Sequence, residues 1–371
     1  MASSNNNEVI SEASPHTIKK FDLIEKYVVA WIQKLMNWHK CTGIAFIDCM
    51  CNSGIYMAAM GNEVHGTPIR VAEVIANAMT YFPHKQAYLY FNDRDSRKIN
   101  ELKKHLPEET RNFHIHTSCE DGNDLLKRIG RTIFSAQGIH YLLVYDPYIA
   151  EINWDALIPF LNNWGEVIIN HMVFDPIRGI SQARKQQTID RYEQTYLTDI
   201  EELATFGSDR EAFENRIEEI IATLHRGENR YYVASFPFFN TRNALVYNLL
   251  HCTNSEIGFK LYKTTAWKTF GDKSSTKNTS EPDGQLVLDF NTTSFTQTSL
   301  KADEYCYYIQ DIVEYIMRKY SGQSGVPIND IWDLLDEHPI FPTDGYKNEI
   351  KRQLKESGNI IEKNKVTFIR R

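Results

Sequence analysis

Four short apolar runs divide the first half of the chain, at residues 44–47, 87–91, 113–116 and 141–145. Short runs of this kind are typical of strands buried inside a parallel sheet. Segments whose apolar residues recur with helical spacing separate or follow the runs, at 69–81, 96–106, 123–133 and 154–164. Together with a further apolar run at 166–170, this alternation predicts an α/β fold with a doubly wound parallel sheet.

An acidic residue follows each of the first four runs closely. These residues are Asp48, Asp93, Asp121 and Asp146. Because parallel strands end at the same edge of a sheet, and ligands bind just beyond the carboxyl ends of the strands, we expect the four acids to line a ligand site. The alternative for each acid taken alone is a helix cap or a turn.

The loop after the first run also has the features of a ligand-binding turn. It reads Asp-Cys-Met-Cys-Asn-Ser-Gly from Asp48 to Gly54. Gly54 allows the backbone to approach a ligand closely, and Asn52 can adopt the left-handed region while offering an amide. The spacing is not that of a phosphate-binding P-loop, so we do not expect a nucleoside triphosphate site.

Residues 1–15 are polar and rich in Ser and Asn, and we expect them to be disordered. An amphipathic helix is predicted at 17–38, where Lys19 and Lys20 could reach a ligand, although a solvated face is the simpler role. A first domain is predicted at 16–300, and the pattern after the strand at 166–170 describes its second half. It contains a helical insertion at about 179–228, paired strands at 231–238 and 244–251, and a mobile loop at about 271–284.

Composition limits the class of protein. A length of 371 residues favours two domains, and the net charge of -7 means that any contact with nucleic acid must come from a local patch. Six cysteines without metal-ligand spacing predict neither a disulfide framework nor a metal site. Because no apolar stretch approaches 18 residues and no signal peptide is evident, we expect a cytoplasmic protein without membrane contact.

The last segment, 301–371, changes character. Helices predicted at 305–320, 331–335 and 346–357 precede a hairpin-like stretch at 359–371, which is the pattern of a winged helix-turn-helix domain. From Tyr346 onward, eight Lys or Arg residues stand against three Glu residues. We expect DNA or RNA to contact this domain through Lys351, Arg352, Lys355, Lys363 and Lys365. The alternative is a protein-binding winged helix with a solvated basic face.

The chain resembles the three-Cys-motif partner proteins, a bacterial and phage family with a methyltransferase-like domain and, in some members, a terminal winged helix. The resemblance implies a Rossmann-like class I methyltransferase sheet, S-adenosylmethionine as cofactor, and a partner protein that carries the three-Cys motif. Of the family's D-x-F-A-G-x-G loop, this chain keeps Asp48 and Gly54, with Met50, Cys51 and Asn52 between them. The matching residues are His16, Thr17, Lys20, Tyr27, Trp31, Phe46, Ile47, Asp48, Gly54, Gly61, Gly66, Thr67, Pro68, Asp146, Pro147, Tyr148, Trp154, Glu166 to Asn170, and Arg178.

From the resemblance, five residues are candidates for binding S-adenosylmethionine: Asp48, Asn52, Gly54, Asp93 and Asp121. Asp48 and Gly54 would face the methionine and ribose part of the cofactor. Asp93 would accept hydrogen bonds from the ribose hydroxyls, and Asp121 from the adenine amine.

Asp146-Pro147-Tyr148 is similar to the Asp-Pro-Pro-Tyr motif of methyltransferases that act on exocyclic base amines. There, a carboxylate accepts hydrogen bonds from the amine, and the aromatic ring stacks on the base. We therefore expect an S-adenosylmethionine-dependent methyltransferase acting on an amine of a nucleic acid or nucleotide. The simplest alternative for the motif is a strand end shaped by proline. The alternative for the protein is a non-catalytic adaptor that keeps the fold and binds a partner enzyme or nucleic acid.

Overall fold

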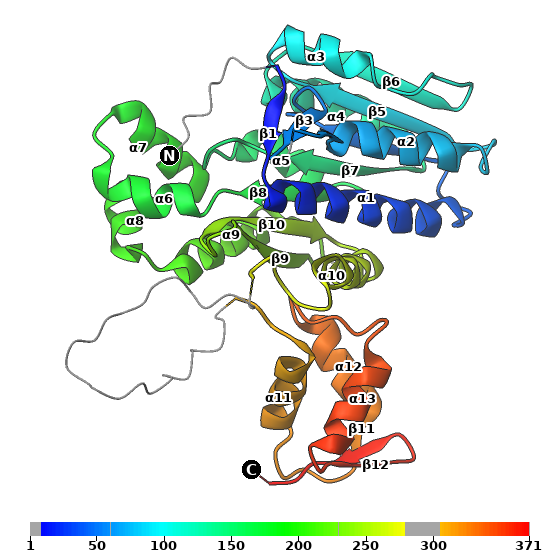
Figure 1. The fold of residues 1–371 in the computed structure, drawn as a ribbon, viewed down its shortest axis with the longest axis vertical. Helices are drawn as coiled ribbons and strands as arrows, with labels where there is room; N and C mark the ends of the chain where they lie inside the picture. Colours follow the sequence, from blue (N-terminus) through cyan, green and yellow to red (C-terminus); the bar gives the residue numbers. More distant parts are fainter. Residues whose placement is uncertain (1–8, 60, 229, 279–304, 371) are drawn as a thin grey trace.

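The computed structural model describes residues 9–59, 61–228, 230–278 and 305–370 (Figure 1). Its centre is a seven-stranded sheet with the order β6-β5-β2-β7-β8-β10-β9. The first five strands of this order are parallel, whereas β10 runs antiparallel to both β8 and β9. The strands are β2 (Gly43–Asp48), β5 (Gln86–Asn92), β6 (Phe113–Ser118), β7 (Ile139–Tyr145), β8 (Gly165–His171), β9 (Tyr232–Phe239) and β10 (Leu245–Thr253).

This strand order, with a single antiparallel strand inserted next to the last parallel one, is the sheet of a Rossmann-like class I methyltransferase. The fold class predicted from the sequence is therefore confirmed, including the antiparallel pairing of β9 with β10. The predicted strand at 113–116 extends to Ser118, and β2, β5, β7 and β8 are each two residues longer than their apolar runs.

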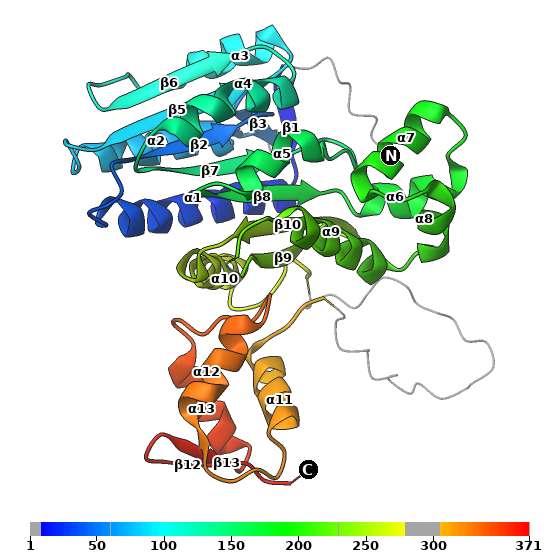
Figure 2. The same ribbon diagram turned by 180° about the vertical axis from the view of Figure 1, so that it is seen from behind.

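Helices cover both faces of the sheet, and the alternation of side chains along β2 explains why. Ile44 and Phe46 pack into one hydrophobic core with α1, α2, α3 and α10, whereas Ala45 and Ile47 pack into another with α4, α5 and α9. Figures 1 and 2 show these two layers from opposite sides. The helices are α1 (Pro15–Met36), α2 (Thr67–Met79), α3 (Ser96–Lys103), α4 (Gly122–Ser135), α5 (Trp154–Leu161), α9 (Arg210–Leu224) and α10 (Glu256–Phe270).

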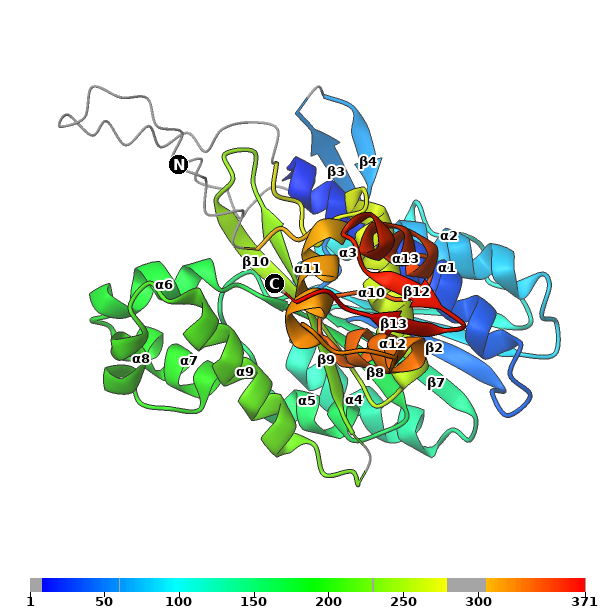
Figure 3. The same cartoon turned by 90° about the horizontal axis from the view of Figure 1, so that it is seen from below.

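The predicted helical insertion lies between β8 and β9, and it begins slightly earlier than expected, at Phe174. It consists of α6 (Phe174–Gly179), a 3-10 turn (Ile180–Gln182), α7 (Gln186–Tyr196), α8 (Ile200–Phe206) and α9. Helices α6, α7 and α8 stand to one side of the sheet, and α9 leads back to it (Figure 3). Tyr192, Tyr196, Leu203, Phe213 and Ile217 join the insertion to the core beneath α4 and α5.

A second, three-stranded sheet was not expected from the sequence. Its strands are β1 (Ser11–Ala13), β3 (Ile55–Ala58) and β4 (Glu63–His65), with β1 parallel to β3 and β3 antiparallel to β4. The expectation of disorder for residues 1–15 is therefore wrong for Ser11–Ala13, because backbone pairing with β3 orders a stretch whose composition is polar. Residues 1–8 lie outside the described part of the chain.

The expected mobile loop at 271–284 is also corrected where it is described. Residues 273–278 pack against the β9–β10 hairpin, and Ser274 and Ser275 are buried. Thr276 Oγ1 accepts a hydrogen bond from the Phe239 N–H at 2.7 Å, and the Asn278 N–H donates to Asn243 Oδ1 at 2.8 Å. Side-chain bonds of this kind are not visible in the composition. Residues 279–284, and the domain boundary expected at 300, lie outside the described residues.

The C-terminal segment follows the element order that the sequence predicted, and its identity as a winged helix stays a prediction. Its sheet has the order β11-β13-β12, and the turn at Lys363 and Asn364 has φ angles of 46° and 64°. The elements are α11 (Ile309–Lys319), β11 (Val326–Pro327), α12 (Ile328–Glu337), α13 (Lys347–Glu356), β12 (Ile360–Glu362) and β13 (Lys365–Thr367).

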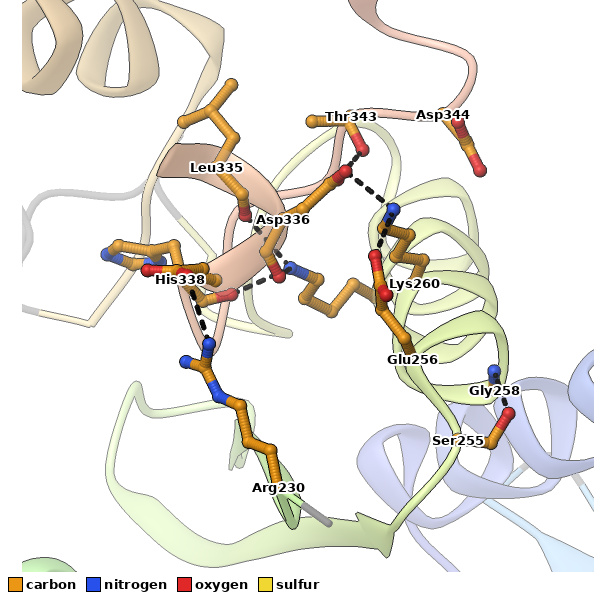
Figure 4. A network of polar contacts seen from close by, with 12 residues as sticks. Arg230, Ser255, Glu256, Gly258, Lys260, Leu335, Asp336, His338, Thr343 and Asp344 are labelled. Carbon is orange, nitrogen blue, oxygen red and sulfur yellow. Dashed lines mark hydrogen bonds and ion pairs between the residues drawn. The ribbon is translucent and has the colours of Figure 1, made fainter. Parts of the chain in front are cut away.

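Polar contacts attach this segment to α10 (Figure 4). The buried Lys263 Nζ donates to the carbonyl oxygens of Leu335, Asp336 and His338 at 2.7 to 3.1 Å, where the end of α12 leaves carbonyls unpaired. Burial lowers the pKa of Lys263 to about 7. Next to it, Lys260 bridges Glu256 and Asp336 at 2.7 and 2.6 Å.

All six cysteines lie among the described residues as free thiols, five of them buried and Cys119 exposed. A search of the described helices finds none that is long and apolar enough to cross a membrane.

Candidate cofactor and acceptor site

The carboxyl ends of β2, β5 and β7 bring three of the four predicted acids to one edge of the sheet. Asp48 is the last residue of β2, and it lies opposite Phe91 of β5 and Val144 of β7. Asp93 and Asp146 are the first residues after the ends of β5 and β7. The register therefore places these carboxylates around one point, as the sequence predicted for parallel strands.

Asp48 is 4% exposed, and its electrostatic state is set by this crowding. Burial raises its pKa to about 7, and the negative charge of Asp146 contributes to the shift. Its only hydrogen bond among the described residues is from the Met50 N–H to Oδ1, at 3.3 Å. Asp48 is therefore a carboxyl group that changes its charge near neutral pH and has few protein partners.

Asp146 is held by two side chains from other elements. Lys20 Nζ of α1 forms an ion pair with Oδ2, and Asn170 Nδ2 of β8 donates to Oδ1. The Asp146 side chain remains 27% exposed, so it is fixed without being covered. The Asn170 Oδ1 atom is buried and has no hydrogen-bond partner among the described residues.

Lys20 corrects the expectation of a solvated face, since the residue is only 8% exposed. It also lies over the ring of Tyr247, with Nζ 5.4 Å from the ring centroid. The sequence carried a signal for this position, because Lys20 shares a helical stripe with the buried Ile24, Tyr27 and Trp31. The sequence could not show its partner, which lies 126 residues further along the chain.

The loop after β2 turns through the left-handed region at Asn52 and Gly54, with φ angles of 59° and 73°. A Cβ atom at Gly54 would lie 2.7 Å from the Leu102 side chain, so glycine is required there for packing as well as for backbone conformation. Asn52 is buried. Its side-chain amide links the loop to β1, because Nδ2 donates to Ser11 Oγ and Oδ1 accepts from the Ser53 N–H.

Asp93 fastens this loop to the end of β5. Its Oδ2 atom accepts from the Asn52 N–H at 3.1 Å, and Oδ1 accepts from the Asp95 N–H at 2.9 Å. A carboxylate offers about four acceptor positions, so Asp93 retains capacity for ribose hydroxyls. It therefore fits the cofactor role, and it also has a structural role that the sequence did not indicate.

Asp121 fits the predicted cofactor role less well. It is the N-cap of α4, with Oδ1 accepting from the Asn123 and Asp124 N–H groups, and Oδ2 is paired with Arg94. The alternative considered for each acid, a helix cap, is thus what the structure shows for Asp121. Asp48, Asp93 and the Asn52–Gly54 turn are the residues that could hold S-adenosylmethionine.

Tyr148 lies beyond Asp146 and is 63% exposed, while Pro147 between them is buried. The exposed ring has the accessibility that stacking on a base requires. Lys98 of α3 lies 5.5 Å from the centroid of this ring, so a base would share the ring with an ammonium group.

The five predicted nucleic-acid contacts lie in the C-terminal segment, separate from the acids in sequence and in fold (Figure 1). Lys355, Lys363 and Lys365 are exposed. Arg352 is paired with Glu349 and Glu356 of its own helix, and Lys351 lies 5.7 Å from the centroid of the Trp332 ring. Lys355, Lys363 and Lys365 are therefore more accessible to phosphate than Lys351 and Arg352.

Glu166, at the start of β8, is another buried carboxylate. It is not among the site residues that the sequence predicts. Its Oε2 atom accepts from Tyr27 Oη of α1 and lies 2.7 Å from His251 Nε2 of β10. The His251 ring stacks on Tyr262, with centroids 4.3 Å apart. Gly258 allows α10 to approach, because a Cβ atom there would lie 2.7 Å from Glu166 Oε1.

Comparison with known proteins adds little to this geometry. No family model matches the chain, and no curated protein sequence matches it either. Among solved structures, the chain is similar to a Legionella pneumophila protein described under the family model DUF519, with 13% identity and a TM-score of 0.37 over 67% of this chain and 93% of that one.

It is also similar to an S-adenosylmethionine-dependent methyltransferase from Agrobacterium tumefaciens, with 8% identity and a TM-score of 0.31 over 65% of this chain and 62% of that one. Human methyltransferase-like protein 13, in complex with SAH, has the same identity and score over 74% of this chain and 99% of that one. Scores this low carry no functional argument, and the fold assignment rests on the strand order and its register.

Proposed function

We propose that the protein is an S-adenosylmethionine-dependent methyltransferase that acts on an amine of a nucleic acid or nucleotide. The observation that carries the proposal is Asp146, which is fixed by Lys20 and Asn170 beside the buried Asp48 and still partly exposed. A carboxylate held in this way, at the carboxyl edge of a methyltransferase-type sheet, supports a role in receiving the acceptor amine, because ligands of such sheets bind beyond the carboxyl ends of the strands.

The chemistry assigned to the chain is orientation of the acceptor. S-adenosylmethionine supplies an electrophilic methyl group when it is bound. Each Asp146 oxygen already accepts one hydrogen bond and has a further lone pair, so the carboxylate can accept an N–H of the amine and direct the nitrogen lone pair. The Lys20 ammonium offsets the negative charge of Asp146 next to Asp48, and Tyr148 provides the ring for stacking.

The cofactor would be held by the turn from Asn52 to Gly54 together with Asp48 and Asp93. The two carboxylates would accept hydrogen bonds from hydroxyl groups of the cofactor. Asp121 would stabilise the start of α4 and position Arg94, with a contact to the adenine amine through its remaining acceptor capacity.

The C-terminal segment supports a proposal about the acceptor. If it is a winged helix, Lys355, Lys363 and Lys365 would contact phosphates of DNA or RNA while Arg352 stays paired with its glutamates. Membership of the three-Cys-motif partner family, and a partner protein carrying that motif, belong to the same proposal and rest on the sequence resemblance.

A non-catalytic adaptor is the second candidate, and two observations favour it. Asp121 is engaged by the helix end and by Arg94, and Lys98 lies over the Tyr148 ring. Both contacts occupy positions that an active methyltransferase would use for the cofactor and the base.

Transfer of labelled methyl groups from S-adenosylmethionine to total DNA, total RNA and free nucleotides separates the two candidates. The methyltransferase proposal predicts label in one acceptor class. Tyr148→Phe should retain the label because the stacking ring remains, and Tyr148→Ala should lose most of it. Cofactor binding without label in any acceptor class would favour the adaptor.

A further inference from the structure

A second cluster of polar side chains lies on the small sheet, next to the loop that carries Gly54. Glu63 and His65 are two residues apart on β4, so their side chains leave the same face of the strand. His105 lies two residues beyond the end of α3. One oxygen or nitrogen atom from each of the three residues lies within 4.8 Å of the others. Figure 3 shows the β3–β4 hairpin projecting from the central sheet. Glu63 is exposed, and His65 and His105 are partly buried.

The two imidazoles in this cluster each have a carboxylate next to one ring nitrogen. His65 Nδ1 lies 3.7 Å from Glu73 Oε1 of α2, and His105 Nε2 lies 3.4 Å from Glu101 Oε1 of α3. Histidines that ligate metals commonly have such a carboxylate partner, which orients the ring and makes the opposite nitrogen more basic. If the carboxylates keep these two nitrogens, the opposite nitrogens, Nε2 of His65 and Nδ1 of His105, would be the metal ligands.

The surrounding contacts hold the cluster in place. Arg70 Nε donates to the His65 carbonyl oxygen at 2.6 Å, which fixes the end of β4. The Lys104 ammonium pairs with the other oxygen of Glu101 at 2.6 Å. These contacts leave Glu101 Oε1 directed at His105, as a supporting carboxylate requires.

We propose that Glu63, His65 and His105 bind a zinc ion. Two imidazole nitrogens and one carboxylate oxygen are a common three-ligand set for zinc, with a water molecule completing four-coordinate geometry. Calcium and magnesium prefer sites made of oxygen ligands and fit this set poorly. Ligand atoms on a tetrahedral zinc ion are about 3.4 Å apart, so small side-chain movements from separations that are all within 4.8 Å would close the site.

The position of the ion gives it a structural role. His65 pairs with Ile55 across the hairpin, and the Gly66 N–H donates to the Gly54 carbonyl at 2.7 Å. An ion bound here would link β4 to the end of α3, and thereby brace the segment that follows the Asn52–Gly54 turn. The proposal does not depend on methyl transfer, because metal binding and stability report on it directly.

The test is a calorimetric titration of zinc chloride into the full chain, prepared without a histidine tag and stripped with a chelator. The parent should bind one zinc ion per chain and gain thermal stability with it. His65→Ala and His105→Ala, which lie on different elements, should each bind at least about 10-fold more weakly and lose the stabilisation by zinc. Glu101→Gln should lower the affinity to a smaller extent.

His84→Ala is the matched control, because His84 is exposed and lies outside the cluster. It should bind zinc as the parent does. Circular dichroism of each zinc-free variant establishes that it is folded. The proposal is overturned if the folded parent binds no zinc at micromolar concentrations. It is also overturned if His65→Ala and His105→Ala bind zinc as tightly as His84→Ala does, since the ion would then be held elsewhere.

Discussion

The same two elements, helix α1 and strand β8, contribute to two clusters around carboxylate groups, one near each end of β8. At the carboxyl end of the sheet, Lys20 of α1 and Asn170 of β8 hold Asp146 beside Asp48. We call this the open cluster. At the amino end, Tyr27 of α1 and His251 of β10 hold Glu166 of β8. We call this the closed cluster.

The two clusters differ in what surrounds the charge. In the closed cluster, the Glu166 and His251 side chains are 4% and 0% exposed. Burial acts to raise the pKa of Glu166, but the hydrogen bond and the charge of His251 lower it overall. In the open cluster, burial and the neighbouring Asp146 raise the pKa of Asp48 to about 7, and the Asp146 side chain stays 27% exposed.

The difference is in how the negative charge is compensated, and it leads to different expected roles for the two clusters. Glu166 has its charge compensated inside the protein, so its expected contribution is to stability. Asp48 and Asp146 are crowded together and retain acceptor capacity, which is typical of groups arranged for a ligand. The predictions below separate stability from activity at the two clusters.

The largest effect is expected from Glu166→Ala. The substitution leaves Tyr27 and His251 buried without their acceptor, which should lower the free energy of unfolding by about 3–5 kcal/mol. Urea denaturation followed by circular dichroism measures this change. Loss of less than about 1 kcal/mol would mean that the closed cluster is not what holds α1, β8 and β10 together.

Asp146→Ala should show the opposite pattern. Methyl transfer should fall by about 10²–10³, the usual loss when one preorganised polar group is removed, while the fold is retained. Rates of labelled methyl transfer and thermal melts are compared with Asp155→Ala, an exposed carboxylate in the first turn of α5. Equal rates for these two variants would remove Asp146 from the chemistry.

Asp48→Asn should stabilise the protein in a pH-dependent way. The folded-state pKa of Asp48 is about 7, above its usual value of 3.8, so the parent loses stability as pH rises from about 4 through 7. The neutral amide escapes this penalty and can still accept from the Met50 N–H. The variant should exceed the parent by roughly 1–3 kcal/mol at pH 8 and by less at pH 5. A difference that is the same at both pH values would contradict the assigned pKa.

The smallest effects are expected in the C-terminal segment. Replacing Lys355, Lys363 and Lys365 together by Gln should weaken nucleic-acid binding. It should also reduce the slope of log affinity against log salt concentration by about 3, because about three phosphate contacts are lost. Arg352→Gln should change binding little, because Glu349 and Glu356 already pair with Arg352. Gel-shift titrations over a range of salt concentrations compare the two. An equal loss in both would show that Arg352 also meets phosphate.

The sequence predicts the central sheet well because its signals are local. The apolar runs, the acids that follow them and the helical spacing between them lie within short segments, and parallel pairing brings the acids together. The helical insertion and the order of the C-terminal elements could be predicted for the same reason. For this reason the sequence predicts that Asp48, Asp93 and Asp146 lie at one edge of the sheet, and their cofactor and acceptor roles stay predictions.

The features that sequence reasoning missed depend on contacts between distant segments. Lys20 reaches Asp146 across 126 residues, and Glu166 reaches His251 across 85 residues. β1 is ordered by pairing with β3, although its own composition is polar. His105 joins Glu63 and His65 only because α3 ends beside the β3–β4 hairpin. None of these pairs has a spacing that marks it along the chain.

Calorimetric titration of S-adenosylmethionine tests the central claim most directly, namely that the cofactor binds at the carboxyl end of the sheet, where Asp93 lies beside the open cluster, and not at the closed cluster. The parent should bind, and Asp93→Ala should bind with a loss of about 1.5–3 kcal/mol, since a charged acceptor and the anchor of the Asn52 loop are both removed. Glu166→Gln, measured under conditions in which it is folded, should bind S-adenosylmethionine as tightly as the parent. Absence of binding by the parent, or equal affinity in the parent and Asp93→Ala, would contradict the account.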